Sequence, residues 1–328
     1  MTVHRLKFPV MFSFGFGQLA EAIKNSGFNV FLLFYYNQVL GVSATLTSVA
    51  LAIALMFDAV SDPLVGSFSD KLRTRFGRRH PLILMAALPL GLSFYCLFNP
   101  PSMTSDWAHF IWLLGFAILV RASLTLYHVP HLALGAELAE DYHQRSTLYA
   151  MSTFFGFLGG ALFVPVSYTL FFPTTDVFNP ALLNKAAYQP WSLMAAGLMI
   201  FAIVVCVIGT RREIPRLVQR VDSDAQQLMR VSALIQEFRE AFNNRSFRAI
   251  FFGMMLSTLV LSVEGVFNPF MGFHFWGLTT EQLRWIPLAQ LVGLFLSLSL
   301  LPIMTRWLDK KRTLIVSALL VILNINIP

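Results

Sequence analysis

The sequence has little charge for its length. Lys, Arg, Asp and Glu make up 12% of its 328 residues, against about a quarter in soluble domains. Hydrophobic residues make up 56%, so a soluble fold of this size would leave much apolar surface uncovered. The two cysteines, Cys96 and Cys206, stand far apart in apolar runs. Their placement argues against a disulfide framework and against a cysteine-based zinc site.

Motifs of several functional classes are also missing. The chain has no Walker motif, no nucleophile elbow and no run of metal-ligand residues. We therefore expect no enzyme activity, no ATP-driven work and no cofactor. The net charge of +7 does not indicate nucleic acid, because Lys and Arg recur in short groups between apolar runs.

The chain is instead rich in long apolar segments. About 20 mostly apolar residues cross the hydrocarbon core of a bilayer as a helix, and nine segments qualify. They lie near residues 10–39, 46–69, 81–99, 108–134, 147–171, 190–209, 247–272, 284–305 and 313–328. A signal peptide ending near Ala20-Glu21-Ala22 is the alternative for the first segment. Because apolar segments recur to the last residue, we favour an all-α integral membrane protein.

The basic residues predict its orientation. Of the 24 Lys and Arg, 20 lie at the N-terminus and in alternate connections, at 71–79, 145, 211–248 and 306–312. Only Lys185 and Arg284 lie in the other connections. The positive-inside rule then places the N-terminus and the basic connections in the cytoplasm. The connection 210–246 has apolar residues at helical spacing, which fits either a surface-lying amphipathic helix or a solvated linker helix; these residues are Leu228, Val231, Leu234, Ile235, Phe238 and Phe242.

A short repeat indicates two related halves. Pro63 is followed seven residues later by Asp70-Lys71, and Pro302 is followed seven residues later by Asp309-Lys310. Six predicted helices separate the copies, as two parallel six-helix halves would require. We therefore expect a first bundle at 1–209, a middle loop at 210–246 and a partial second bundle at 247–328. On this interpretation about nine of twelve helices are present and the chain is truncated.

Two aspartates stand inside the second apolar segment. Asp58 and Asp62 are four residues apart, so their carboxyl groups share one helix face. Two carboxylates so close favour a cation between them or a proton on one of them. The alternative is a structural ion pair with Lys24 or Arg121 of another segment. The repeat places Ser297 and Leu301 at the equivalent positions, which a scaffold role shared by both halves would not predict.

Other polar residues in the apolar segments are candidates for a solute cavity, because a polar group in a span needs a partner or a function. Glu21 and Lys24 either pair with each other or face the solute. His128 is either a proton carrier, a solute ligand or a core histidine. The candidates are Glu21, Lys24, Asn25, Arg121, Tyr127, His128, Thr153 and Glu264.

One stretch resembles a known family. The residues run from Phe57 through Asp58, Asp62-Pro63 and Gly66 to Asp70-Lys71, and continue with Arg73, Arg75, Gly77-Arg78-Arg79 and Pro81. This stretch resembles the signature of the glycoside-pentoside-hexuronide:cation symporters, the melibiose permease-like group of the major facilitator superfamily. The segments 34–41, 127–130 and 133–145 resemble the same family.

The resemblance implies a twelve-helix, two-bundle transporter. It implies that Asp58 and Asp62 bind sodium, lithium or a proton, with Thr125 as a further cation-site position. Ser61 stands where sodium users can carry asparagine, which weakens the case for sodium. His128 and Thr153 align with a sugar-binding aspartate and arginine of the family, so those positions do not support a glycoside. Animal relatives resemble lysolipid carriers.

The basic stretch after the second segment suggests a gate. Charged side chains there are expected to pair across the two bundles and hold the cytoplasmic side shut, while a glycine would allow close helix approach. The gate residues are Gly66, Asp70, Lys71, Arg75, Arg78 and Arg79.

Together these features predict a monomeric symporter in the bacterial inner membrane. We expect it to couple Na⁺ or H⁺ to a sugar, glycoside or related solute by alternating access, with the bilayer and the solute as its partners. The alternatives are a non-transporting or inactive remnant of such a protein and a carrier of a non-sugar amphipathic solute.

Overall fold

The computed structural model describes residues 6–139, 141–221 and 240–325. Helices account for nearly all of these residues, and no β-strand occurs among them. The longer elements are α1 (Phe8–Ser26), α2 (Ala44–Lys71), α3 (His80–Leu97), α4 (Asp106–Leu138), α5 (Tyr142–Leu170), α6 (Tyr188–Thr210), α7 (Ile214–Val221), α9 (Arg245–Phe270) and α11 (Trp285–Ile325). The shorter ones are η1 (Gly27–Leu32), η2 (Tyr35–Val39), η3 (Ala181–Leu183), η4 (Lys185–Ala187), η5 (Arg211–Glu213), η6 (Met271–Phe275) and α10 (Thr280–Leu283).

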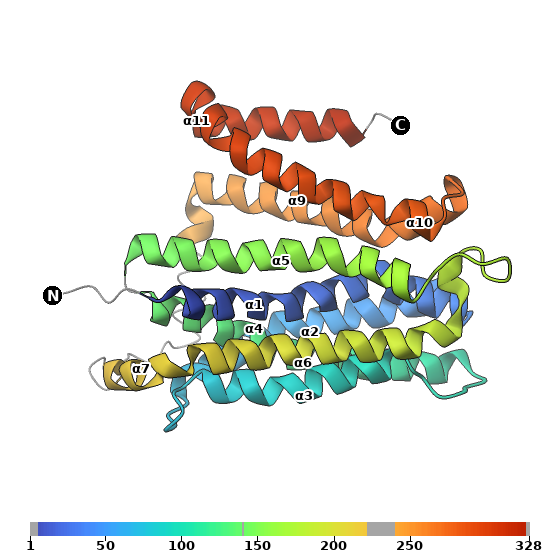
Figure 1. Ribbon diagram of the computed structural model, residues 1–328, viewed down its shortest axis with the longest axis horizontal. Coiled ribbons are helices and arrows are strands. Elements are labelled where there is room, and N and C mark those ends of the chain that lie inside the picture. The colour runs from blue at the N-terminus through green and yellow to red at the C-terminus, as the bar shows by residue number, and fades with distance from the viewer. Residues whose placement is uncertain (1–5, 140, 222–239, 326–328) are drawn as a thin grey trace.

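Helices α1 to α6 form one bundle, the first bundle. Within it α1 packs on α5 and α6, α3 packs on α4 and α6, and α2 packs on α4. Helices α9, α10 and α11 form a second group, which contacts η1 and α5 (Figure 1). We call the end with the connection 72–79 and α7 the basic end, and the end with the connections 40–43, 98–105, 171–187 and 276–279 the far end. The basic end is on the left of Figure 1 and the far end on the right.

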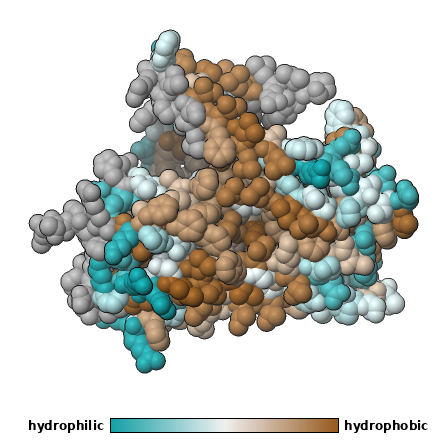
Figure 2. All heavy atoms as spheres, viewed as in Figure 1, coloured by the Kyte–Doolittle hydropathy of each residue, from teal (hydrophilic) through white to brown (hydrophobic). Residues whose placement is uncertain are grey.

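Six helical segments of the described chain are long and apolar enough to cross a membrane. They are Ala44–Lys71, His80–Leu97, Asp106–Leu138, Gln144–Leu170, Lys185–Leu217 and Arg245–Phe275. Figure 2 shows hydrophobic side chains across the middle of the visible face and hydrophilic side chains gathered at both ends. The predicted all-α integral membrane class is therefore confirmed.

The remaining predicted spans are helical but differ in detail. Segment 10–39 is built from α1 followed by π-helical turns. The described residues of the last two predicted spans, 285–305 and 313–325, belong to α11, whose ribbon folds back on itself (Figure 1). The predicted loop at 306–312 is wrong, because these residues are helical. Its Lys, Arg, Leu and Trp residues are compatible with a helix, and it holds no Gly or Pro to end one.

Two predictions fall partly outside what is described. Of the amphipathic residues predicted in the middle loop, Leu228, Val231, Leu234, Ile235 and Phe238 lie outside the described residues. The second copy of the repeat lies in α11, at positions whose side chains are not described.

Aromatic side chains fill the core of the first bundle at the far end. Trp191 of α6 is fully buried, and its Nε1 donates to Ser167 Oγ of α5 at 2.8 Å. The ring of Phe31 lies 4.5 Å from that of Trp191, and the ring of Phe98, directly after α3, lies 4.8 Å from it. These contacts join α3, α5, α6 and the end of the α1 segment into one packed unit.

Glycines allow the helices of this bundle to approach closely. A Cβ added to Gly15 of α1 would lie 2.9 Å from the backbone carbon of Met151 on α5, and one added to Gly159 would lie 2.7 Å from a methyl carbon of Leu19. Gly15 and Gly159 thus serve helix packing. Gly66 differs, since an added Cβ would lie 3.6 Å from Val129, an ordinary contact. The prediction that Gly66 is needed for close approach is therefore wrong.

We expect Gly15→Ala to lower the free energy of unfolding by about 1–3 kcal/mol, because the backbone of Met151 cannot move aside as a flexible side chain could. Gly66→Ala should leave stability unchanged or raise it, because alanine is the better helix former. Melting of the two detergent-solubilised variants checks this. Equal destabilisation by both substitutions would contradict it.

Candidate functional site

Two parallel helices place four polar side chains in register. The Arg121 guanidinium of α4 forms an ion pair with Asp58 of α2. One turn further, the Thr125 hydroxyl donates to Asp62 Oδ1 at 2.8 Å. Because both pairs are four residues apart on parallel helices, one helix contact aligns both interactions. Asp58 Oδ1 is buried and has no hydrogen-bond partner in the described part of the chain.

The ion pair was the alternative left open for Asp58. The sequence pattern favours a cation between two carboxylates, whereas the structure places the Arg121 guanidinium against one of them. Ser61 does not reach either carboxylate, because its hydroxyl donates to the Asp58 carbonyl oxygen at 3.4 Å.

Helix α1 brings three more groups to this region. The Lys24 side chain is buried, and its Nζ lies 4.7 Å from the centre of the Phe28 ring, which also faces Arg121. Lys24 donates to Asn25 Oδ1 at 3.3 Å. Glu21 Oε2 lies 2.7 Å from His128 Nδ1 of α4 and accepts from Gln18 Nε2. Glu21 thus contacts α4, and no Glu21–Lys24 ion pair occurs among the described pairs.

The charges of this cluster do not balance. The charge cluster comprises the carboxylates Glu21, Asp58 and Asp62, the cations Lys24 and Arg121, and His128. With neutral His128 its formal charge is −1, and with protonated His128 it is zero. An uncompensated charge is costly in a low-dielectric interior. The arrangement therefore favours one added positive charge, either a proton or a metal cation.

A cavity of about 800 Å³, the large cavity, borders the cluster between the first bundle and α11. Of the predicted candidates it is lined by Glu21, Asn25, His128 and Thr153. Its wall also includes polar residues that the sequence analysis did not single out, namely Gln18, Tyr149, Ser152 and Gln290. Each stands in an apolar helix, and Ser152 Oγ donates to Gln18 Oε1 at 3.2 Å.

A second cavity of about 360 Å³, the small cavity, lies nearer the far end. It shares Asn25, Gly156, Gly160 and Gln290 with the large cavity, so the two adjoin. Glu264 of α9 lines it together with Asn29 and Asn268, two amides that the sequence analysis missed.

Lys24, Arg121 and Tyr127 line neither cavity. Tyr127 is fully buried, and its hydroxyl fills the space beside Gly17. Its ring stacks at 5.1 Å on His131, whose Nε2 contacts the Phe14 carbonyl oxygen at 3.0 Å. The structure therefore makes Tyr127 and His131 core residues of the first bundle.

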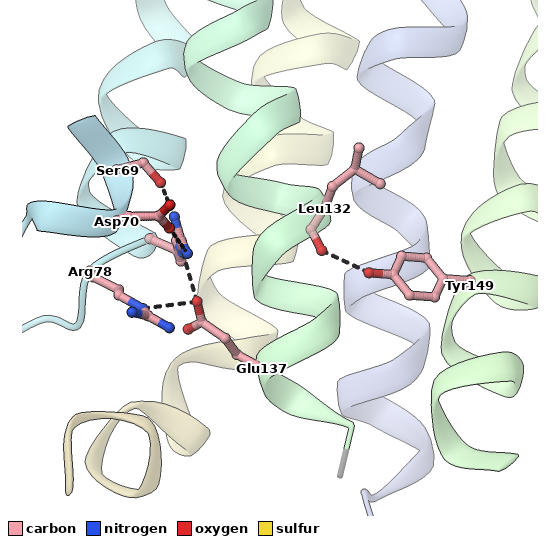
Figure 3. Close-up of polar contacts among 7 residues, drawn as sticks. Ser69, Asp70, Arg78, Leu132, Glu137 and Tyr149 are labelled. Carbon is pink, nitrogen blue, oxygen red and sulfur yellow. Dashed lines mark hydrogen bonds and ion pairs between the residues drawn. The ribbon is translucent and has the colours of Figure 1, made fainter. Parts of the chain in front are cut away.

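The predicted gate forms a network inside the first bundle. Glu137 of α4 accepts from Arg79 Nε at 2.7 Å and from Arg78 Nε at 2.9 Å. Arg79 also donates to Ser69 and Asp70 at the end of α2 (Figure 3). These bonds connect α2, the 72–79 connection and α4.

The contacts described join these groups within the first bundle, and their pairing across the bundles stays a prediction. Arg75 stacks on the adjacent Phe76 at 4.7 Å, and Lys71 is exposed at the end of α2. Beside the network, Tyr149 Oη donates to the Leu132 carbonyl oxygen at 2.8 Å and connects α5 to α4 (Figure 3).

The two helix groups are hydrogen-bonded at the far end. Thr174, after α5, donates from its backbone N–H to Glu281 Oε1 at 2.8 Å and from its hydroxyl to Oε2 at 2.7 Å. Thr280 Oγ1 donates to the Phe172 carbonyl oxygen at 2.8 Å. Phe34 packs against Phe273, with ring centres 5.7 Å apart. We call the hydrogen bonds of Thr174 and Thr280 the far-end clasp.

Partial burial acts to raise the pKa of Glu281, but the two hydrogen bonds from Thr174 outweigh it and lower the pKa from 4.5 to about 2. The clasp is therefore stabilised by this ionisation above pH 4.5, and that contribution is lost as the pH falls through about 2. Glu281→Gln removes one accepted hydrogen bond and the charge at neutral pH. We expect a lower melting temperature for Glu281→Gln at neutral pH and a smaller difference from the parent protein near pH 2. A difference in melting temperature that does not change with pH would contradict the stabilising role of the ionised Glu281.

Comparison with known proteins identifies relatives over most of the chain. The family model described as MFS/sugar transport protein matches residues 13–327. An uncharacterized symporter of Synechocystis sp. is 31% identical over 176 residues, which are 52% of this chain and 32% of the relative. A glucuronide carrier protein homolog of Escherichia coli is 25% identical over 323 residues, 96% of this chain and 66% of the relative. The sodium-dependent lysophosphatidylcholine symporter 1 of Gallus gallus is 29% identical over 125 residues, 37% of this chain and 23% of the relative. In these alignments the chain spans between about a quarter and two thirds of each relative.

Proposed function

The chain belongs to the MFS/sugar transport protein family, and we propose that it is a symporter that moves a sugar or glycoside together with a cation. The observation that carries this proposal is the charge cluster beside the large cavity. A group of fixed charges that lacks one positive charge binds a cation at low cost and releases it when the surroundings change.

Two places in the cluster can accept the cation. Asp62, with the Thr125 hydroxyl and the unpartnered Asp58 Oδ1, offers oxygen ligands of the kind that sodium takes. The His128–Glu21 contact offers a site for a proton. Both sites restore neutrality, so binding at one disfavours binding at the other. His128 and Glu21 also form part of the wall of the large cavity, so the cation and the solute bind next to each other. In this proposal that proximity couples their transport.

The solute occupies the large cavity in this proposal. A volume of about 800 Å³ lies within the usual range for small-molecule sites. Amide and hydroxyl groups from α1, α5 and α11 line it and match the alternating donors and acceptors of a sugar.

Alternating access accounts for the far-end clasp. With the N-terminus and the basic end in the cytoplasm, the clasp closes the outer side while the large cavity lies towards the inner half of α5. The state described is then inward-facing. Binding of cation and solute would shift the balance towards a state in which the clasp is open.

A second candidate solute is amphipathic. Leu132, Phe157, Leu291 and Leu294 give the large cavity an apolar wall that could accept a lipid chain, and one relative is named a lysophosphatidylcholine symporter.

Equilibrium binding to the purified protein tests the proposal. Neutral sugars, glycosides and a lysolipid are measured with and without Na⁺ and at two pH values on either side of the histidine range. We expect one class to bind, with an affinity that depends on Na⁺ or on pH. If no solute binds, or if the affinity depends neither on Na⁺ nor on pH, the proposal fails.

A further inference from the structure

The walls of both cavities, as far as their residues are described, hold carboxylates but neither lysine nor arginine. Glu21 lines the large cavity and Glu264 lines the small one. The only basic side chain in either wall, among the described residues, is His128, which lies against Glu21. Lys24 and Arg121 lie outside both walls, next to the aspartates of α2.

Glu264 differs from the other acidic residues of this region. It makes no hydrogen bond or ion pair with the described residues, and its side chain is exposed to the small cavity. Glu21 and Asp58, in contrast, each face a basic partner. The carboxylate of Glu264 is therefore available to a solute.

The groups around Glu264 are amides and a phenol. Asn25 and Asn29 of the α1 segment, Asn268 of α9 and Gln290 of α11 line the same cavity, with Tyr168 of α5. Amides donate and accept hydrogen bonds without charge, and a carboxylate accepts them strongly from hydroxyl or ammonium groups. Such a set suits a ring that bears several hydroxyls.

We propose that Glu264 is a charge-selectivity residue, which makes the joined cavities accept neutral polyhydroxylated or amine-bearing solutes and reject acidic sugars. This inference rests on the proposed function and goes beyond it by naming the substrate class. A solute carboxylate near Glu264 would meet a like charge with no Lys or Arg in the described wall to compensate it, and contacts between like charges disfavour binding.

The choice distinguishes this chain from what one of its relatives is named for. A glucuronide carries a carboxylate, which needs a basic partner when it is buried, and the described walls offer only a histidine that Glu21 already faces.

Matched sets of ligands test the inference. For several sugars, the neutral methyl glycoside, the glycuronic acid and the amino sugar are titrated into the purified protein. We expect the neutral and amino forms to bind at least ~10-fold more tightly than the acid, a difference of about 1.4 kcal/mol. Glu264→Gln keeps the size of the side chain and removes its charge, so it should raise the affinity for the acid. The ratio of the affinity for the neutral form to that for the acid should then be close to one.

Asp106→Asn is the matched control, since Asp106 lies at the far end outside both cavity walls. It should leave the ratio unchanged. If the acid binds the parent protein as tightly as the neutral form, or if Asp106→Asn changes the ratio as much as Glu264→Gln does, the inference is overturned while the proposed function stands. If no member of any set binds, the proposed function fails and the inference fails with it.

Discussion

Arg79→Ala should lower the free energy of unfolding by about 3 kcal/mol. The side chain of Arg79 is only 6% exposed and donates to Glu137, Ser69 and Asp70. Removing one partner of a buried ion pair typically costs about 3–5 kcal/mol, because the other partner is left without compensation. The lower end applies here, since Arg78 still contacts Glu137. Thermal or denaturant unfolding of the detergent-solubilised protein measures the loss.

Arg75→Ala is the matched control for this prediction. Arg75 belongs to the same basic connection but is exposed and contacts the neighbouring Phe76 ring. The control should melt with the parent protein. Equal destabilisation by the two substitutions would mean that the network adds nothing to stability beyond the general loss of a positive charge.

Asp62→Asn should remove the cation dependence of solute binding. Asp58 is already paired with Arg121, whereas Asp62 accepts one neutral hydrogen bond, from Thr125, among the residues described. If a sodium ion binds there, losing the carboxylate charge costs about 3 kcal/mol, or roughly 100-fold in its affinity. If the cation is a proton on His128, the variant should shift the pH dependence instead.

Ser61→Ala is the control for Asp62→Asn. Its hydroxyl bonds to the backbone of its own helix and reaches neither carboxylate, so the cation dependence should persist. If Asp62→Asn keeps both the sodium dependence and the pH dependence of the parent protein unshifted, the cation site lies elsewhere.

Sequence patterns predicted the main features of this site because helical spacing determines which residues share a face. Asp58 and Asp62 on one helix, and Arg121, Thr125 and His128 on another, could be recognised in this way. The pairing could not be predicted, since it depends on how two helices are rotated and how far each is shifted along its neighbour. Arg121 and Lys24 were equal candidates for Asp58, and the contact between α2 and α4 selects Arg121.

Other features had no distinctive sequence signal. Asn29, Asn268 and Gln290 are single amides in apolar helices, and such amides occur both in helix packing and in cavities. The gate was predicted between bundles because its charges are adjacent to a membrane end, whereas the ion pairs described connect Arg78 and Arg79 to Glu137 of α4. The helical residues 306–312 show that a basic connection does not have to be a loop.

Coupling of solute movement to a cation is the central claim, and gradient-driven uptake tests it most directly. The protein is reconstituted into vesicles, and uptake of the solute that binds best is followed under an imposed sodium gradient, under an imposed proton gradient and without either. The account predicts accumulation above the external concentration with one of the two gradients and equilibration alone when that gradient is collapsed. Uptake at the same rate and to the same level under all three conditions would contradict it.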